Sequence, residues 1–236
     1  MSELSLEGKQ IVITGGTGAL GTAVVGTLLQ AGARCHVPYH DQEECDRFPH
    51  AEQVHLHKVD CTNEAEVAAF YAGFDTLWTS VHLAGGFAMA PIEQTEAKAA
   101  RRMFELNAMT AMLCCREAIN AFRRDTRAAD APGGRIVNVS ARPAVSPAAN
   151  LTAYAMSKAA VASLTQTLAE ELKNERILVN AVLPSLMDTP ANRRAMPKAD
   201  FDAWPKVEQV AAAIHWLISP ANTITSGALL PVYGRA

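Results

Sequence analysis

The sequence predicts an α/β fold: a doubly wound parallel sheet of seven strands with helices on both faces. Two observations lead to this prediction. Short apolar strand patterns alternate with amphipathic helix patterns along the whole chain, and a glycine-rich turn joins the first strand to the first helix. Repeated strand-helix-strand units build parallel sheets with helices on both faces. Because no linker, internal repeat or low-complexity segment interrupts residues 1–236, we expect a single domain.

In the first half of the chain, the elements are predicted from apolar runs bounded by turn residues. Gly32 ends the first helix, and Asn63 or Thr62 is the expected N-cap of the second. Strands are expected at residues 9–14, 34–39, 53–59 and 76–83, and helices at residues 19–31 and 63–71.

The second half repeats the alternation with longer helices. One continuous helix is expected at residues 95–125, and others at residues 151–173 and 207–217. Strands are expected at residues 135–140, 177–183 and 228–232, with Pro184 ending the sixth. Residues 188–205 contain three prolines and little periodicity. We therefore interpret the stretch of about 186–206 as a loop that forms a lid.

The composition excludes several classes of protein. A formal charge of −3 without a basic tract argues against a nucleic-acid partner. The polar start is unlike a signal peptide, and no apolar run approaches the ~20 residues of a membrane helix. The five cysteines have no Cys-x-x-Cys spacing, and the histidines show no metal-ligand spacing, so we expect no metal. Reduced cysteines favour a cytoplasmic location.

The glycine-rich turn runs from Thr14 to Gly21 and indicates a nucleotide site in a Rossmann fold. Gly15 allows a tight turn, Gly18 lets a pyrophosphate approach the backbone, and Gly21 lets the helix pack on the sheet. The unpaired N–H groups of the helix N-terminus can bind the anion. Thr17 and Leu20 belong to the same turn and are counted with the cofactor site, although the motif could also be a plain strand-helix connection.

The end of the second strand bears on the choice between NADP(H) and NAD(H). An acid there binds the ribose 2′-hydroxyl of NAD, whereas a positive residue favours the 2′-phosphate of NADP. Tyr39 occupies the usual acid position, His40 could face a phosphate, and Asp41 could reach a hydroxyl. We favour NADP(H) on this pattern. Asp60 and the adjacent Cys61 are expected near the adenine, although Asp60 could instead cap the next helix.

A phenol and an ammonium lie four residues apart in Tyr154-x-x-x-Lys158. On a helix the two side chains share one face, one turn apart. A fixed cation lowers the pKa of a phenol from its usual value near ~10, which would let Tyr154 exchange a proton with a substrate. Most such pairs lie on an ordinary helix surface. Together with the glycine-rich turn, however, this pair predicts a catalytic site.

With these motifs in this order, residues 8–234 resemble the short-chain dehydrogenase/reductase family. The resemblance implies an NAD(P)(H)-dependent oxidoreductase in which Tyr154 is the acid/base and Lys158 binds the nicotinamide ribose. It further implies that Ala84 and Gly85 lie beside the adenine and that Asn107 holds a water in a proton relay. In the family, a segment like 184–189 contacts the nicotinamide carboxamide, which implicates Leu186 and Thr189.

One position departs from the family pattern. The serine that polarises the substrate carbonyl lies thirteen residues before the tyrosine, and here that position is Ala141. Ser140 is one residue earlier, and neighbouring side chains on a strand point to opposite faces. Ser140 in an irregular strand, or Ser146 or Thr152 in the following loop, could supply the hydroxyl instead.

In lacking this serine, the chain also resembles the quinonoid dihydropteridine reductases, which keep the Tyr-x-x-x-Lys pair without the serine. They share the Ala84-Gly85-Gly86-Phe87 turn and a segment close to residues 183–201. Asn107 and the lack of an acid after the second strand differ from those enzymes. The resemblance is therefore mixed, and it implies a carbonyl or quinonoid substrate.

We thus expect an enzyme that transfers hydride to a small-molecule carbonyl or quinonoid substrate. The alternative is a non-catalytic NAD(P)-binding sensor or regulatory subunit, which Ala141 favours and the set of Tyr154, Lys158 and Asn107 disfavours. Phe87, Met89, Met187, Met196 and Trp204 could line the pocket. The family resemblance also implies a homodimer or homotetramer.

Overall fold

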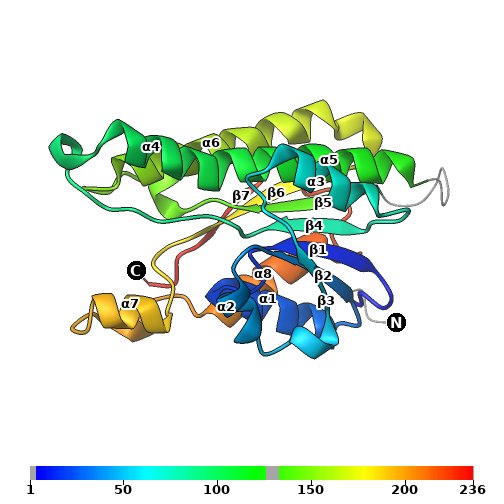
Figure 1. The fold of residues 1–236 in the computed structure, drawn as a ribbon, viewed down its shortest axis with the longest axis horizontal. Coiled ribbons are helices and arrows are strands. Elements are labelled where there is room, and N and C mark those ends of the chain that lie inside the picture. The colour runs from blue at the N-terminus through cyan, green and yellow to red at the C-terminus, as the bar shows by residue number, and fades with distance from the viewer. Residues whose placement is uncertain (1–3, 126–132, 236) are drawn as a thin grey trace.

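The computed structural model describes residues 4–125 and 133–235, in which a parallel sheet is covered by helices on both faces (Figure 1). The sheet has seven strands in the order β3-β2-β1-β4-β5-β6-β7, and all neighbouring pairs are parallel. The predicted fold class is confirmed. The strands are β1 (Gln10–Thr14), β2 (Arg34–Tyr39), β3 (His55–Lys58), β4 (Thr79–His82), β5 (Arg135–Val139), β6 (Leu178–Pro184) and β7 (Leu229–Val232).

The helices divide between the two faces of the sheet. Helices α1 and α8 pack on each other beneath the sheet in Figure 1, and α3, α5 and α6 lie above it. None of the described helices is long and apolar enough to cross a membrane. The helices are α1 (Ala19–Gln30), α2 (Gln42–Asp46), α3 (Glu64–Ala72), α4 (Ala97–Phe104), α5 (Thr110–Arg124), α6 (Thr152–Glu171), α7 (Pro190–Ala195) and α8 (Val207–Ile218).

Each face of the sheet has its own hydrophobic core. On the α1 and α8 side, Val24, Leu28 and Ile214 are fully buried against the strands. On the α3, α5 and α6 side, Val67 and Leu172 belong to a second buried cluster. A parallel sheet covered on both faces needs apolar side chains on both, which explains the nearly continuous apolar strands of the sequence.

The strand order reverses between β1 and β4, and ligands bind at such a reversal beyond the carboxyl ends of the strands. Here the turn after β1 touches the turn after β4. A Cβ atom on Gly15 would lie 2.6 Å from the backbone nitrogen of Ala84, and Gly15 has a φ of +66°. Only glycine meets both constraints. The two glycine-containing turns are therefore held together at this edge.

The single helix predicted over residues 95–125 contains a change of helix type. Helices α4 and α5 are joined by a π-helical turn at Glu105–Met109, which contains Asn107. The Thr110 hydroxyl donates to the Leu106 carbonyl within it (2.7 Å). A π turn inserts extra backbone without breaking the helix, so the apolar spacing alone did not indicate it.

The predicted loop at residues 188–205 also contains helix, namely α7 and the short turn Phe201–Ala203. Thr189 caps α7 by accepting from the Asn192 N–H (3.2 Å), and Pro190 starts the helix. This Thr-Pro pair is a helix-start signal that the three prolines obscured. The expectation of an irregular loop was wrong because the first proline starts a helix here.

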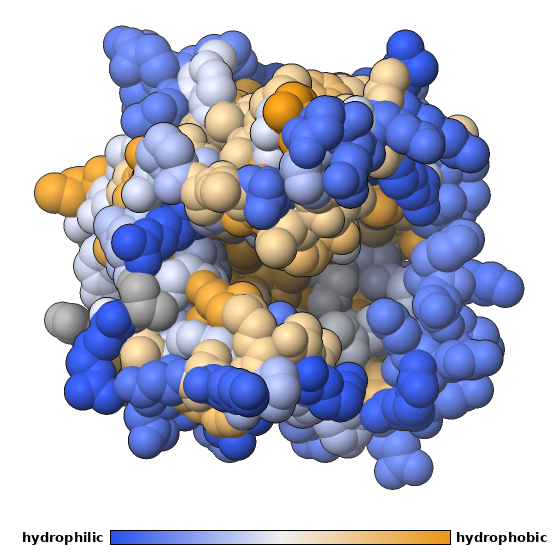
Figure 2. All heavy atoms as spheres, turned by 90° about the vertical axis from the view of Figure 1, so that its left-hand side faces the viewer, coloured by the Kyte–Doolittle hydropathy of each residue, from blue (hydrophilic) through white to orange (hydrophobic). Residues whose placement is uncertain are grey.

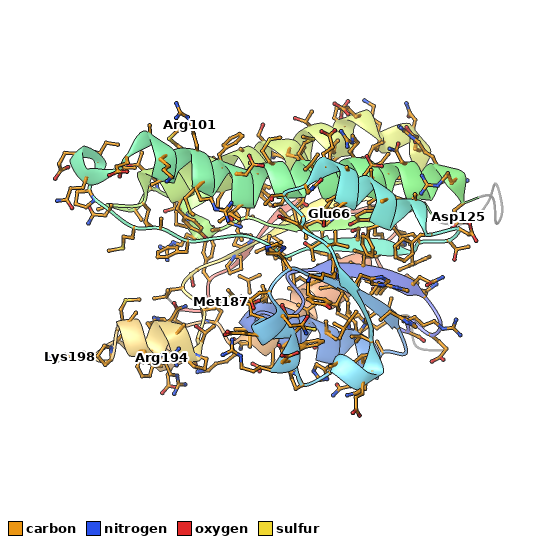
Figure 3. All side chains as sticks on the ribbon, viewed as in Figure 1. Glu66, Arg101, Asp125, Met187, Arg194 and Lys198 are labelled. Atoms are coloured by element: carbon orange, nitrogen blue, oxygen red, sulfur yellow. The ribbon has the colours of Figure 1, made fainter. Side chains whose placement is uncertain are left out.

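Asp188 joins the two ends of this segment. Its carboxylate accepts from Arg193 (2.5 and 2.7 Å) and from Lys206 (2.6 Å), and these hydrogen bonds hold its pKa well below the usual range. The Asp188 N–H also donates to the Pro205 carbonyl (2.9 Å). Figure 3 shows Arg194 on the segment, away from the sheet. The role of the segment as a lid stays a prediction. Asp188 links its first residues to its last through these hydrogen bonds.

Candidate functional site

The glycine-rich turn forms a cradle at the start of α1. A Cβ atom on Gly21 would lie 2.2 Å from the Gly15 carbonyl oxygen, so glycine is required there. At Gly18, by contrast, the nearest atom to such a Cβ is the Gly15 carbonyl oxygen at 3.5 Å, an ordinary van der Waals contact, so packing against the protein does not itself require glycine there. The N-terminus of α1 has no side-chain cap and no acid in its first turn. These features fit a pyrophosphate.

Thr17 and Leu20 lie within this turn but face different surroundings. Leu20 is buried in the core shared with α8, so its contribution to a nucleotide site would come from its backbone. The Thr17 hydroxyl donates to a carboxylate oxygen of Glu44 on α2 (3.1 Å). Sequence analysis did not include Glu44, because nothing in the local pattern places α2 beside the turn.

The residues after β2 and β3 are brought to the same edge. His40 is exposed, and its Nδ1 lies 3.9 Å from an Asp60 carboxylate oxygen. Asp41 caps α2 by accepting from two of its N–H groups (2.8 and 3.2 Å). Partial burial opposes ionisation of Asp60, but hydrogen bonds from the Thr62 N–H and hydroxyl lower its pKa overall. Asn63, and not Asp60, caps α3.

The other predicted cofactor residues follow the carboxyl ends of β3, β4 and β6. Gly85 is exposed, the Ala84 N–H donates to the Thr14 hydroxyl (3.3 Å), and Leu186 is half-buried just after β6. Cys61 is half-buried against the core beneath α3 and α5. The Thr189 hydroxyl oxygen accepts the N-cap bond of α7, while its O–H can still donate.

Tyr154 lies near the start of α6, and its ring packs edge-on against Phe87, with 5.0 Å between the centroids. Lys158 is buried one turn later, and its Nζ donates to the Val139 carbonyl (2.8 Å) at the end of β5. The ammonium lies 6.0 Å from the Tyr154 ring centroid. The predicted pair is thus brought together beyond β5.

The pKa of Tyr154 shifts in the direction opposite to the one expected from the sequence. Burial raises the pKa of Tyr154 to about 12, and burial lowers the pKa of Lys158 to about 8. The expected lowering of the phenol pKa by the cation does not occur here, because desolvation dominates and the ammonium donates to a backbone carbonyl. At neutral pH the phenol therefore carries its proton.

Asn107 is buried in the π-helical turn and pairs with the turn after β4. Its Oδ1 accepts from the Gly86 N–H (3.0 Å), and its Nδ2 donates to the Gly86 carbonyl (3.1 Å). The same Nδ2 donates to the Ser157 hydroxyl oxygen (3.0 Å). Both amide hydrogens are thus engaged by protein atoms. Sequence analysis missed Ser157, although its place three residues after Tyr154 is a signal for a hydroxyl that bonds back to the helix.

The hydroxyl groups near Tyr154 do not restore the family serine directly. Ser140 is buried, and its hydroxyl donates to the Lys158 carbonyl (2.8 Å). Ala141 has extended backbone (φ −161°, ψ 158°), so its side chain points opposite to that of Ser140. Ser146 is half-buried in the loop that follows, and Thr152 is exposed as the first residue of α6.

This edge of the molecule is hollowed, and apolar atoms gather in its walls (Figure 2). Of the apolar side chains predicted to line a pocket, Phe87 and Met89 are each 63% exposed, and Met196 is 39% exposed. Trp204 is buried, and Met187 packs against the α1 and α8 core. The exposed members are thus available to a ligand, whereas Trp204 supports the segment from within.

A family model described as short chain dehydrogenase matches residues 9–200. The chain belongs to the short-chain dehydrogenase/reductase family. It is 30% identical to the 3beta-hydroxysteroid dehydrogenase 1 of Eggerthella lenta over 254 residues, a match that covers 97% of this chain and 94% of that protein. The chain is accordingly an oxidoreductase of this family.

Solved structures share the short-chain dehydrogenase fold seen here. One is ElxO with NADP bound, with a TM-score of 0.86 and 22% identity over 96% of this chain and 98% of that one. Another is xylitol dehydrogenase with NAD+ bound, with a TM-score of 0.85 and 21% identity over 97% of this chain and 99% of that one. The further resemblance to dihydropteridine reductases stays a prediction.

Proposed function

We propose that this oxidoreductase uses NAD(P)(H) to transfer hydride to a carbonyl or quinonoid substrate, with Tyr154 as the acid/base. The observation that carries the proposal is the position of Tyr154. Its ring contacts Phe87 beside the glycine turn after β4, and Lys158 is buried one helical turn behind it. The nucleotide cradle after β1 touches that same turn at Ala84.

The residues present fit a dinucleotide. Gly15, Gly18 and Gly21 would hold its pyrophosphate at the N-terminus of α1, and Gly85, Leu186 and Thr189 would contact the remainder. Similarly folded proteins carry NADP in one case and NAD+ in another, which supports this assignment. When bound, the nucleotide supplies or accepts the hydride, which no protein side chain can do.

Residues of the chain would then donate the proton that accompanies the hydride. Because the pKa of Tyr154 is about 12, the phenol is protonated at neutral pH and can donate to a substrate oxygen or nitrogen. Lys158, with a pKa of about 8, is mostly charged at neutral pH and would stabilise the phenolate that remains. Asn107 fixes the Gly86 peptide beside them, and any relay water would join this already bonded network.

The substrate class follows from the missing hydroxyl. Ala141 offers no donor to a carbonyl oxygen, and the Ser140 hydroxyl is engaged by α6. A substrate that accepts hydride without strong polarisation, such as a quinone or a quinonoid pterin, fits this site better than an unactivated ketone. The exposed Phe87 adds an apolar wall for such a ring.

Restoring the hydroxyl is expected to broaden the substrate range. In Ala141→Ser, the rate of ketone reduction should rise roughly tenfold, the effect of one added hydrogen bond to the developing oxyanion. Steady-state kinetics on a ketone panel measure it. The control is Ser140→Ala, which should lower the melting temperature and leave ketone rates unchanged. Loss of activity in the control would identify Ser140 as the polarising group.

Two features act in opposite directions on nucleotide preference. The exposed His40 favours the 2′-phosphate of NADP(H), whereas the Glu44 carboxylate beside Thr17 disfavours another negative charge. Glu44→Gln is expected to tighten NADPH binding roughly fivefold and to leave NADH binding unchanged, since a nearby like charge is worth about 1 kcal/mol at a wet surface. Fluorescence titration measures both. Glu43→Gln, one residue away, is the matched control, and an equal effect there would exclude a specific role for Glu44.

The decisive test of the proposed function is titration with NADH and NADPH, followed by their oxidation across four substrate classes. The classes are ketones, 3-oxoacyl thioesters, quinones and quinonoid pterins. Turnover with any of them supports the enzyme. Tight nucleotide binding without turnover on all four would support the alternative, a sensor or regulatory subunit, which Ala141 alone favours.

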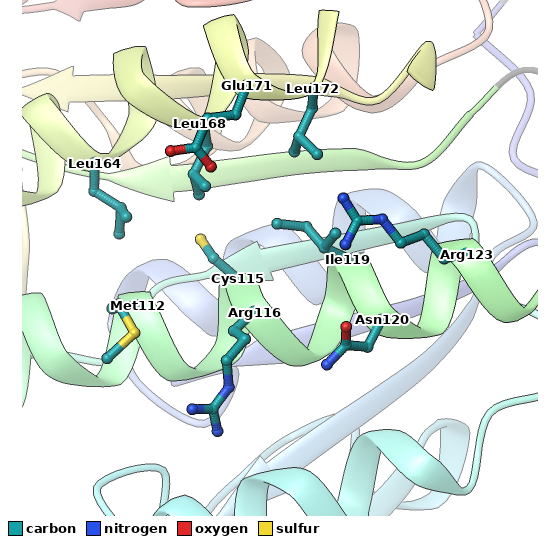
Figure 4. Close-up of a pocket in the computed structure, with 10 residues that line it drawn as sticks. All are labelled: Met112, Cys115, Arg116, Ile119, Asn120, Arg123, Leu164, Leu168, Glu171 and Leu172. Carbon is teal, nitrogen blue, oxygen red and sulfur yellow. The ribbon is translucent and has the colours of Figure 1, made fainter. Parts of the chain in front are cut away.

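We also propose a cytoplasmic homodimer or homotetramer. All five cysteines are free thiols, which fits a reducing compartment. Figure 4 shows a pocket lined by residues of α5 and α6. We expect a second copy to pack on this face. Its apolar members are Met112, Ile119, Leu164, Leu168 and Leu172. Sedimentation equilibrium would distinguish the monomer, the dimer and the tetramer.

A further inference from the structure

Ser157 is a fully buried hydroxyl that the proposed chemistry does not use. It lies on α6 between Tyr154 and Lys158 in the sequence, and its hydroxyl donates to the Tyr154 carbonyl (2.7 Å). The same oxygen accepts from Nδ2 of Asn107 (3.0 Å), fifty residues away in the chain. Ser157 therefore joins the backbone of the tyrosine turn to the π-helical turn between α4 and α5.

Asn107 extends this connection to the turn after β4. Its side-chain amide pairs with both the N–H and the carbonyl of Gly86, as a neighbouring strand would. The next residue is Phe87, whose ring packs against the ring of Tyr154. The contacts thus connect the Tyr154 backbone to the Tyr154 ring. They run through Ser157, Asn107, Gly86 and Phe87.

Because of these contacts, the Ser157 hydroxyl does more than form a hydrogen bond within its own helix. Gly86 occupies one Asn107 amide hydrogen, and Ser157 occupies the other. Without the serine oxygen, a buried N–H faces no acceptor, and an unsatisfied donor is costly enough to reorient the amide or admit water. Reorientation would release the Gly86 peptide, because Asn107 holds both of its polar groups.

We propose that Ser157 is a positioning residue for Tyr154, which acts through Asn107 and Gly86 to hold Phe87 against the tyrosine ring. The inference rests on the proposed function only for the kinetic consequence. The structural consequence, a fixed Gly86 peptide, can be measured on the protein without any turnover.

The chain provides a matched control on the same helix. The Thr165 hydroxyl donates to the Val161 carbonyl (2.8 Å) and accepts from Nδ2 of Asn138 (3.0 Å). Thr165 is also fully buried. It therefore has the same bonding pattern as Ser157, with an asparagine that contacts the sheet core instead of the Gly86 turn. Thr165→Val should cost similar stability without affecting the site.

Hydrogen exchange of the Gly86 amide, followed by NMR, is the first test. In Ser157→Ala the Gly86 amide is expected to exchange roughly tenfold faster than in the wild type. This is the effect of weakening one hydrogen bond that protects the amide from exchange. In Thr165→Val it should exchange at the wild-type rate. If Gly86 exchanges equally in the two variants, Ser157 does not position this turn.

Kinetics supply the second test, on whichever substrate is turned over. Ser157→Ala should lower kcat roughly tenfold, because the tyrosine geometry is disturbed, and should change the nucleotide Kd by less than this, through Gly85 next to the released Gly86 peptide. In an Asn107→Leu background the same substitution should have no further effect on kcat. An additive loss there would overturn the route through Asn107.

Two arrangements keep the test decisive. If Ser157→Ala folds poorly, Ser157→Cys retains a weak acceptor of similar shape and should give an intermediate Gly86 exchange rate. If the wild type turns over no substrate, the proposed function fails while Gly86 exchange still decides the positioning role. If turnover is found and Ser157→Ala keeps the wild-type kcat, the positioning role fails alone.

Discussion

Tyr154→Phe is expected to lower kcat/KM for reduction by roughly 10²–10⁴-fold, the usual contribution of general acid catalysis. The substitution removes the phenol oxygen and retains the ring, so the edge-on contact with Phe87 is preserved. Lys158 keeps its bond to the Val139 carbonyl. The nucleotide Kd should therefore stay within about twofold, and the whole loss should appear in the chemical step.

Tyr71→Phe is the matched control for this result. Tyr71 is a fully buried residue of α3, and its hydroxyl lies 2.7 Å from the Ser80 hydroxyl. Removing that oxygen should lower the melting temperature and leave kcat/KM unchanged. Stopped-flow and steady-state oxidation of the reduced nucleotide would compare the two variants. A Tyr154→Phe enzyme that retained the wild-type rate would rule out the proton-transfer role.

The parts of the site that sequence analysis predicted depend on short-range geometry. Gly15 and Gly21 lie within one strand-helix turn, where conformation and close packing require glycine. Tyr154 and Lys158 lie four residues apart, and helical periodicity alone places them on one face. The parallel sheet with helices on both faces was also predicted, from the alternation of strands and helices along the chain.

The parts that sequence analysis could not predict depend on long-range contacts. Asn107 meets Gly86 across 21 residues and Ser157 across 50, through a π turn that no apolar pattern encodes. The pKa of Tyr154 likewise depends on how deeply the fold buries it. Spacing indicated a cation beside the phenol, but the Val139 carbonyl, which binds that cation, belongs to another element.

We also expect the protein to lose stability in mild acid, because it contains a buried histidine. His82 on β4 lies between the Ser80 hydroxyl (2.8 Å from Nε2) and Asn138 Oδ1 (2.8 Å from Nδ1), with the Cys115 sulfur 3.5 Å from Nδ1. Burial lowers its pKa from 6.5 to about 4, although the bond to Asn138 partly opposes this. The neutral ring is therefore the form that the fold accommodates.

The sign of the effect follows from which state binds the proton first. As the pH falls through 6.5, the unfolded chain protonates His82 while the folded chain does not, so the unfolded state is favoured. The loss continues until the folded state also binds the proton near pH 4, and it amounts to roughly 3 kcal/mol for this shift. Burial and the charges of His55 and His57 lower the pKa of His36 in the same direction.

Urea unfolding at a series of pH values between 7.5 and 4 would measure this slope. His82→Gln should reduce stability at neutral pH, because it disturbs a buried hydrogen-bonded network, and should flatten the decline between pH 6.5 and 4. Parallel slopes in the wild type and His82→Gln would assign the acid sensitivity elsewhere, with His36 and its stacked partners on β3 as the next groups to replace.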